Sequence, residues 1–336
     1  SPDNGRSGLD WSSGYHYSDS IIVGFSHTHL SGTGIGDLCD IQFMPATLPK
    51  IFSDEEIVKY KFISKFDHKN EKASPGYYSV ILIDYNITTE LTATLLSGLQ
   101  RHTFSKDGEE FIQLDLGYSK NWDTPTETFL KIINDHTICG YRYSTGWAKD
   151  QRVCFYAEFS KPIVKSFLIQ DSVCIKTLNE VKGKTTRAIF QFDLKTNSEM
   201  FIKTGISSVS MDNAKLNLEN DIIGWNFDKV KKEAENNWEE ELSKIEVKSS
   251  NKNLLAAFYT SLYHSMLAPI IFNDANGEYK GADGNIHKAR DYTKYSIFSL
   301  WDTFRAEHSL LTITQPDKVD DMINSMLSHY NEYGIL

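Results

Sequence analysis

The distribution of apolar residues changes its period near residue 225. Before that point, short segments rich in β-forming residues, most with apolar and polar residues in alternation, are separated by turn residues. These segments are 77–85, 90–95, 111–116, 137–143, 152–159 and 187–193. Because this alternation buries one face of an antiparallel sheet, we expect a β-sandwich, with a hairpin formed by 137–143 and 152–159.

After residue 225 the apolar residues recur every three to four positions, which is typical of helices. We expect helices over 229–247 with Asn226 or Asp228 as the N-cap, from Ser249 or Ser250 to just before Pro269, over 297–312 and over 317–333.

Strands followed by helices indicate separate domains. We therefore predict a β-sandwich domain at 1–224, a linker helix at 225–247 and a helical domain at 248–336. The helical domain has too few helices for a closed helical architecture, so we expect the chain to end inside it.

The charge and the cysteines narrow the function classes. The chain has 35 Lys and Arg against 45 Asp and Glu, a net charge of −10, which argues against nucleic acid as a partner. No apolar run approaches the roughly 18 residues of a membrane-spanning segment. The four cysteines have no spacing typical of zinc ligands. Cys139 and Cys154 flank the expected hairpin, either as a disulfide or as buried thiols.

Three short motifs leave alternatives open. Gly32–Asp37 lacks the features of a phosphate loop and is interpreted as a tight turn. The sequence from His27 to His29 would place both imidazoles on the same side of a strand, as metal ligands, a hydrogen-bonded pair or part of a polar cleft. Asp274–Glu278 is interpreted as a surface turn, because its spacing does not fit a calcium loop.

A Trp next to an Asp occurs where a helix is expected to begin. Trp301 could support a sugar ring while Asp302 accepts hydrogen bonds from its hydroxyls. An ion pair of Asp302 with Arg305, three residues along the helix, is an equal alternative. Paired carboxylates for glycosidic acid–base chemistry cannot be recognised from spacing alone.

Four longer segments together resemble glycoside hydrolase family 92, the calcium-dependent exo-acting α-mannosidases. They are SGYHYSDS at 13–20, GFSHTHLSGTG at 24–34, FDHKNEKASPGYY at 66–78 and FSLWDTFR at 298–305. The resemblance implies an N-terminal β-sandwich, a helical linker and the beginning of an (α/α)6 barrel. It also implies an inverting mechanism, in which one carboxylic acid protonates the leaving oxygen and a carboxylate activates water.

The resemblance also implies which residues bind the substrate. Trp301 and Asp302 resemble residues around the non-reducing mannose, and Trp11, His27 and His29 are further candidates from the sandwich. The catalytic acid, the base and the calcium ligands are expected beyond Leu336, so no catalytic or metal-binding residue is assigned here.

Two function classes follow. In the first, the chain is part of an exported, periplasmic or cell-surface α-mannosidase that releases mannose from glycans, with an α-1,2-type linkage preferred. We expect the chain alone to be inactive, because this activity needs calcium and the remainder of the catalytic domain. In the second, it is a non-catalytic β-sandwich module that binds glycans. Apolar surface exposed on the helices would distinguish the first class from the second, because a stand-alone module would not expose such surface.

Overall fold

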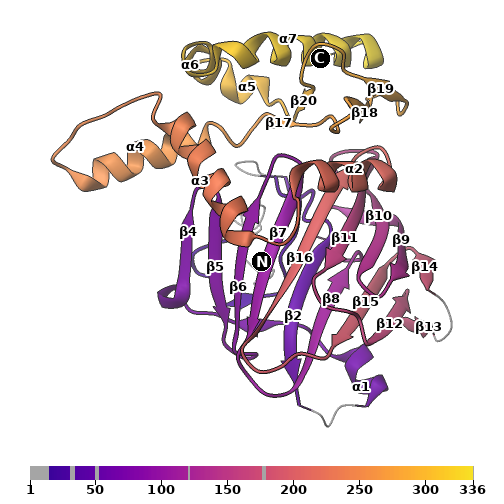
Figure 1. Cartoon of the computed structure of the whole chain (residues 1–336). Helices are drawn as coiled ribbons and strands as arrows, with labels where there is room; N and C mark the ends of the chain where they lie inside the picture. Colours follow the sequence, from indigo (N-terminus) through magenta and orange to yellow (C-terminus); the bar gives the residue numbers. More distant parts are fainter. Residues whose placement is uncertain (1–14, 31–34, 50–52, 120–121, 176–178, 336) are drawn as a thin grey trace.

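Two large antiparallel sheets make up most of the described N-terminal part of the chain in a computed structural model (Figure 1). The structure describes residues 15–30, 35–49, 53–119, 122–175 and 179–335. Among these, the larger sheet has nine strands, in the spatial order β14 (Glu180–Gly183), β9 (Thr124–Asn134), β10 (Thr137–Thr145), β11 (Gln151–Phe159), β16 (Ser198–Ser207), β7 (Ser97–Phe104), β6 (Ile87–Ala93), β5 (Tyr77–Leu82) and β4 (Glu71–Ser74). The smaller sheet has the order β13 (Val173–Ile175), β12 (Lys165–Gln170), β15 (Thr186–Phe192), β8 (Glu109–Asp115) and β2 (Gln42–Leu48).

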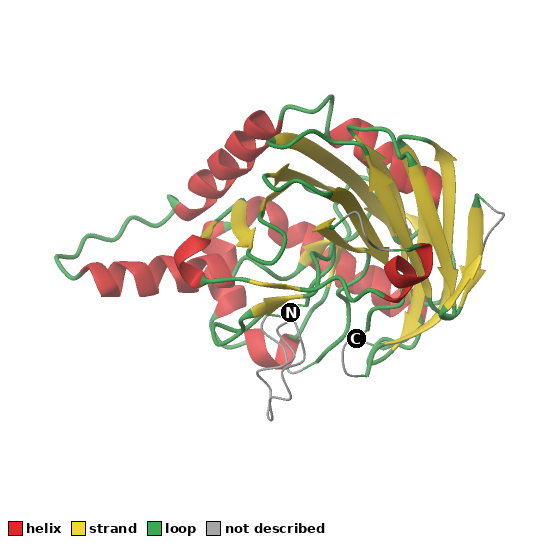
Figure 2. Ribbon diagram, turned by 90° about the horizontal axis from the view of Figure 1, so that it is seen from below, coloured by secondary structure: helices red, strands yellow, loops and turns green. Residues whose placement is uncertain are grey.

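Aromatic side chains join the two sheets. Phe159 of β11 in the larger sheet lies with its ring 6.3 Å from Phe43 of β2 and 5.5 Å from Phe190 of β15, both in the smaller sheet. All three are fully buried. Seen from below, the strands lie side by side and most helices lie outside the sheets (Figure 2). The core therefore lies between the sheets, as the alternating pattern predicts.

The expected hairpin is confirmed, but the expected alternative of a disulfide across it is not. β10 and β11 are paired, with Cys139 opposite Tyr156 and Cys154 opposite Tyr141. The two thiols are thus out of register, and all four cysteines are free. Burial raises the pKa of the Cys154 thiol to about 12, so this cysteine is a neutral core residue.

The helical part begins earlier than the period change suggests. Helix α2 (Met211–Asp221) packs across β16 and β11 before the linker helix α3 (Phe227–Leu242), whose N-cap is Asn226 as predicted. α2 lies so close to the sheet that a β-carbon on Gly205 of β16 would be 2.1 Å from the carbonyl oxygen of Ala214. Glycine is required there by this close approach.

Four further helices follow in the described residues, with two short antiparallel strand pairs between the first and the second of them. The helices are α4 (Lys252–His264), α5 (Leu300–Thr303), α6 (Glu307–Thr314) and α7 (Pro316–Tyr333). The strand pairs are β17 (Ile270–Ile271) with β20 (Tyr295–Ser296) and β18 (Glu278–Lys280) with β19 (Ile286–Lys288). The single helix predicted over 297–312 is therefore wrong. Small elements of the sandwich part are β1 (Ile21–Ile22), β3 (Ser64–Lys65), α1 (Asp54–Lys59) and the 3-10 turn η2 (His68–Asn70).

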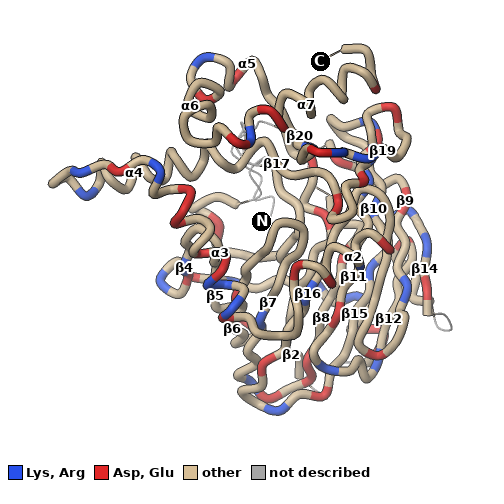
Figure 3. The backbone as a smooth tube through the Cα atoms, turned by 45° about the horizontal axis from the view of Figure 1, so that its top comes forward, with Lys and Arg blue, Asp and Glu red and all other residues tan. Residues whose placement is uncertain are grey.

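The described residues carry charges of both signs. Basic and acidic residues are interspersed over the described part of the chain, in both the sheets and the helices (Figure 3). Within the same residues, no helix is long and apolar enough to cross a membrane. The domain boundaries at 224 and 247 stay predictions.

Candidate functional site

A cavity of about 1220 Å³ lies between the turn ends of the larger sheet and the helical part. The sandwich side of its lining includes 27–29, the β6–β7 turn at 94–96 and the start of β11 at 150–153. The other side includes one face of α3 with Trp238, the segment 265–272 and the segment 295–297. Polar groups of Ser207, Asp274 and Lys280 also reach the cavity, which is thus a polar cleft with aromatic and apolar walls.

His27 lines this cleft but is held by its own hydrogen bonds. Residues 27–29 are not in a strand, contrary to expectation; the segment is connected to β2 by a single bridge between Phe25 and Phe43. The Nδ1 atom of His27 donates to the carbonyl oxygen of Ile41 at 2.8 Å, so Nε2 is left as an acceptor, 3.5 Å from the Gln100 amide. Burial lowers the pKa of His27 to about 4, so its ring is neutral at pH 7.

A buried network of charged side chains holds the segment 27–29 in place. Thr28 donates from Oγ1 to Asp40 at 2.7 Å, and Gln151 donates to the same carboxylate oxygen at 2.9 Å. The other Asp40 oxygen accepts from Arg142, which also binds Asp123. Asp40, Asp123 and Arg142 expose 2% or less of their surface. Two cleft residues, Thr28 and Gln151, are therefore oriented by one buried carboxylate.

Asp274 connects the sandwich to the helical part at the base of the cleft. Its carboxylate accepts hydrogen bonds from Ser207 Oγ at 2.6 Å, from Asn213 Nδ2 at 2.8 Å and from Asn217 Nδ2 at 2.8 Å. The side chain is 2% exposed, and burial raises the pKa of this carboxyl group. The interpretation of Asp274–Glu278 as a surface turn is therefore wrong at Asp274.

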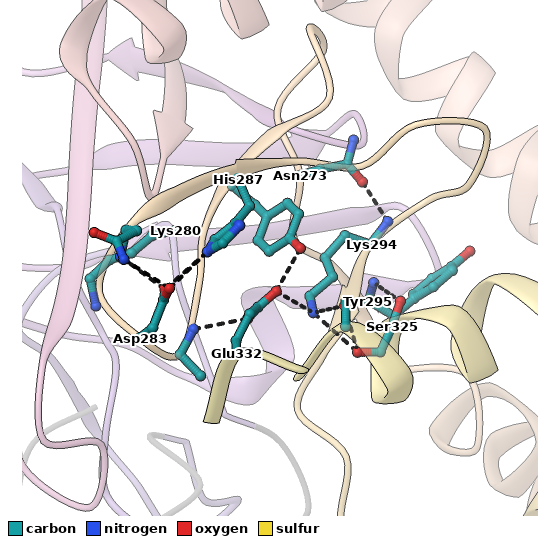
Figure 4. A network of polar contacts seen from close by, with 12 residues as sticks. Asn273, Lys280, Asp283, His287, Lys294, Tyr295, Ser325 and Glu332 are labelled. Carbon is teal, nitrogen blue, oxygen red and sulfur yellow. Dashed lines mark hydrogen bonds and ion pairs between the residues drawn. The ribbon is translucent and has the colours of Figure 1, made fainter. Parts of the chain in front are cut away.

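A second network fixes α7 against the β18–β19 hairpin (Figure 4). Glu332 of α7 accepts from the Tyr279 hydroxyl at 2.7 Å and from the backbone N–H of Ala282 at 3.0 Å. The buried Lys294 donates from Nζ to the Ser325 carbonyl at 3.1 Å and lies 3.8 Å from Glu332. These contacts position the far wall of the cleft, because Tyr295 follows Lys294 directly and lines it.

The structure does not bring all the predicted substrate-binding residues together. Trp301 and Asp302 lie on α5, are exposed, and do not belong to the cleft lining, whereas His27 and the exposed His29 do. Asp302 accepts a hydrogen bond from Ser299 Oγ at 2.5 Å. The ion pair with Arg305 is absent from the contacts of the described residues. Trp11 lies outside the described residues.

Several residues that line the cleft or support its lining were not found from the sequence. Asp40, Arg142 and Asp274 come from distant segments, and no spacing between them signals their contact. Among the described residues, no group of three or more His, Cys, Asp and Glu side chains is placed to hold a metal ion. The described residues therefore provide no such cluster for calcium, and no chemical step is derived through calcium.

An antiparallel sandwich that meets a helical domain across a polar cleft is the architecture expected for a carbohydrate-cleaving enzyme of the family that the sequence resembles. Family models match nearly all of the chain: the glycosyl hydrolase family 92 N-terminal domain over residues 1–207 and the family 92 catalytic domain over residues 213–336. The chain belongs to glycosyl hydrolase family 92.

Solved structures agree with this assignment. A family GH92 α-mannosidase from Bacteroides thetaiotaomicron is 38% identical, with a TM-score of 0.89 over 97% of this chain and 45% of that one. A family GH92 inverting mannosidase from Bacteroides thetaiotaomicron VPI-5482 is 26% identical, with a TM-score of 0.83 over 97% of this chain and 43% of that one. The expected fold, an antiparallel sandwich followed by the first helices of an (α/α)6 barrel, is thereby confirmed.

A curated relative from another organism also matches the chain. An uncharacterized secreted glycosidase of Arthroderma benhamiae is 27% identical over 327 residues, which cover 87% of this chain and 40% of that protein. The chain thus spans less than half the length of the proteins that it matches.

Proposed function

We propose that this chain is the N-terminal part of an exo-acting α-mannosidase that releases terminal mannose from mannosides and N-glycans, with α-1,2 linkages preferred. The observation that carries the proposal is the 38% identity to a family GH92 α-mannosidase, which extends over 97% of the chain and so includes both sides of the cleft. The secreted relative supports export of the protein to the periplasm or cell surface.

In this proposal the chain contributes substrate binding, and the acid and base lie beyond Leu336. Asp302, an exposed carboxylate, would accept hydrogen bonds from two mannose hydroxyls, and Trp301 would form the apolar edge of the pocket. His27 and His29 would line the sandwich side. Calcium, held by residues outside this chain, would bind sugar hydroxyls and favour ring distortion toward the transition state.

Apolar surface on the helices supports a need for the remainder of the catalytic domain. The Trp301 side chain is 82% exposed, and Phe304 of the following turn and Ile313 of α6 are also largely exposed. Several large apolar side chains exposed on neighbouring helices are consistent with a face that another part of the protein covers.

The test is product analysis with the full-length protein. Mannobioses with α-1,2, α-1,3 and α-1,6 linkages are supplied separately, and proton NMR follows the first mannose released. We expect β-mannose, fastest from the α-1,2 isomer, and no release in excess chelator until calcium is restored. Initial α-mannose would contradict inversion. Glycan binding without any release would favour the non-catalytic module instead.

A further inference from the structure

The loop between β10 and β11 carries an exposed tryptophan at the edge of the cleft. Trp147 lies in this loop and is 70% exposed. Cys154 of β11 is opposite Ser207, the last residue of β16, so the loop lies at the same end of the sheet as the start of α2. In Figure 1 this end of the sheet faces the helical part.

The loop is fixed in place by a buried carboxylate. Asp37, which is 6% exposed, accepts hydrogen bonds from the backbone N–H of Trp147 at 3.1 Å and of Ala148 at 2.9 Å. A β-carbon on Gly146 would lie 2.5 Å from the nearer Asp37 oxygen, so glycine allows this close contact. The backbone below the indole is therefore ordered before any ligand arrives, which reduces the entropy cost of binding.

Hydrogen-bonding groups follow Trp147 directly along the cleft. Ala148 and residues 150–153 belong to the cleft lining. Asp150 binds Arg152 at 3.0 Å and Lys280 at 2.9 Å, which joins the loop to β18 on the other side. The side chains of Asp150 and Arg152 are each more than one third exposed, so both retain hydrogen-bonding capacity. An exposed aromatic ring on an ordered backbone, followed within a few residues by charged planar groups, is suited to a pyranose ring with its hydroxyls.

We propose that Trp147, with Asp150 and Arg152, forms a subsite for the second pyranose ring of the substrate, the sugar that leaves when terminal mannose is released. The inference rests on the proposed function, because it assigns the leaving-group side of the same cleft. The indole stacks on one face of the leaving sugar, while Asp150 and Arg152 bind its hydroxyls.

The experiment uses the full-length protein and two substrates that differ only in the leaving group. α-1,2-Mannobiose has a second ring, whereas α-mannosyl fluoride has none. Trp147→Ala should lower kcat/KM for mannobiose about tenfold and leave kcat/KM for the fluoride within about twofold. Trp147→Phe, which keeps a ring, should recover most of the loss. Ile223→Ala, at an exposed apolar residue between α2 and α3, is the control and should change neither value.

The outcomes separate this inference from the proposed function. Equal loss on both substrates, or no loss on either, overturns the subsite while the wild-type protein remains a mannosidase. A large fall in melting temperature with equal kinetic loss would mean that another part of the protein covers Trp147, and also overturns it. Failure of the wild-type protein to cleave either substrate overturns the proposed function and the subsite with it.

Discussion

Asp40 and Arg142 form an ion pair, with 2.5 Å between Oδ1 and Nη1, in which neither side chain exposes more than 1% of its surface. The guanidinium also donates to Asp123 and to the carbonyl oxygens of Leu116 and Tyr118. The second Asp40 oxygen binds Thr28 at the cleft. A charge that is fully removed from water thus supports the wall on which substrate would lie.

Asp40→Asn should destabilise the protein by about 3 kcal/mol, since removal of one partner leaves a buried charge incompletely compensated. The free energy of unfolding from urea titration measures this. Glu180→Gln is the control, because Glu180 and Lys131 pair at 3.8 Å on the surface with both side chains about half exposed. This change should cost less than about 1 kcal/mol. Equal effects of the two substitutions would contradict the role assigned to burial.

Two histidines, the fully buried His102 and the partly buried His27, predict a loss of stability in mild acid. Burial lowers the pKa of His102 to about 3 and that of His27 to about 4, both below the usual 6.5. Between those values and 6.5 the unfolded chain binds more protons than the folded one, so stability is complete above pH 6.5 and falls as the pH decreases. Each histidine contributes up to about 1.4 kcal/mol per pH unit in this window.

His102→Gln should therefore reduce the difference in unfolding free energy between pH 6 and pH 5 by about 1 kcal/mol relative to wild type. His68 is a control of opposite sign, because its hydrogen bond to Glu71 raises its pKa. Its contribution is complete below pH 6.5 and is lost at higher pH. His68→Gln should leave the change between pH 6 and pH 5 as in wild type. An unaltered slope in His102→Gln would show that this ring is already protonated in the folded protein.

The buried hydrogen bonds of Asn217 on α2 join the two parts of the chain, so removal of this side chain should lower the free energy of unfolding. This fully buried amide donates to the Ile206 carbonyl and to Asp274, both at 2.8 Å, and accepts from the backbone N–H of Ala275 at 2.8 Å. Asn217→Ala leaves these buried groups without a partner and should cost about 3 kcal/mol in urea unfolding. Lys215→Ala, on the exposed face of the same helix, should cost less than about 1 kcal/mol. A loss below about 1 kcal/mol for Asn217→Ala would mean that water replaces the amide.

The sequence predicts those parts of the fold that depend on local pattern. The strands β5, β8, β10, β11 and β15 follow from β-propensity and alternation, and the N-cap of α3 follows from Asn226. α2 was missed because it has few apolar residues, although Ser210 caps it and Ala214 and Leu218 are four residues apart. The helix expected over 297–312 is interrupted at 304–306, where its apolar residues alone give no sign of a break.

The cleft could not be predicted in the same way. Asp274 is 67 residues from Ser207, and Arg142 is 102 residues from Asp40, so their contacts depend on the packing of the two parts. The chemistry of Trp301 and Asp302 left sugar binding and an ion pair as equal alternatives. Only the resemblance of their segment to the family favoured sugar binding, and the structure leaves that role as a prediction. Local propensity specifies elements, whereas tertiary contacts bring the polar groups of a site together.

The final prediction concerns Asp302. Its carboxylate lies in the first turn of α5, where the helix dipole favours negative charge, and it accepts a hydrogen bond from Ser299. An ionised carboxylate only accepts hydrogen bonds, and two mannose hydroxyls can donate them. Hydrogen bonds to a charged group contribute roughly 1.5–3 kcal/mol each, so Asp302→Ala in the full-length protein should lower kcat/KM at least about a hundredfold.

The melting temperature decides between sugar binding and a structural role. Asp302 is exposed, so Asp302→Ala should change it by no more than about 2 °C. Ser299→Ala is the matched control, because it removes the local hydrogen bond and leaves the carboxylate in place. Its kcat/KM should fall only a few-fold, since the sugar hydroxyls still find their acceptor. Near-normal kinetics of Asp302→Ala would discard the sugar-binding role, whatever the change in stability.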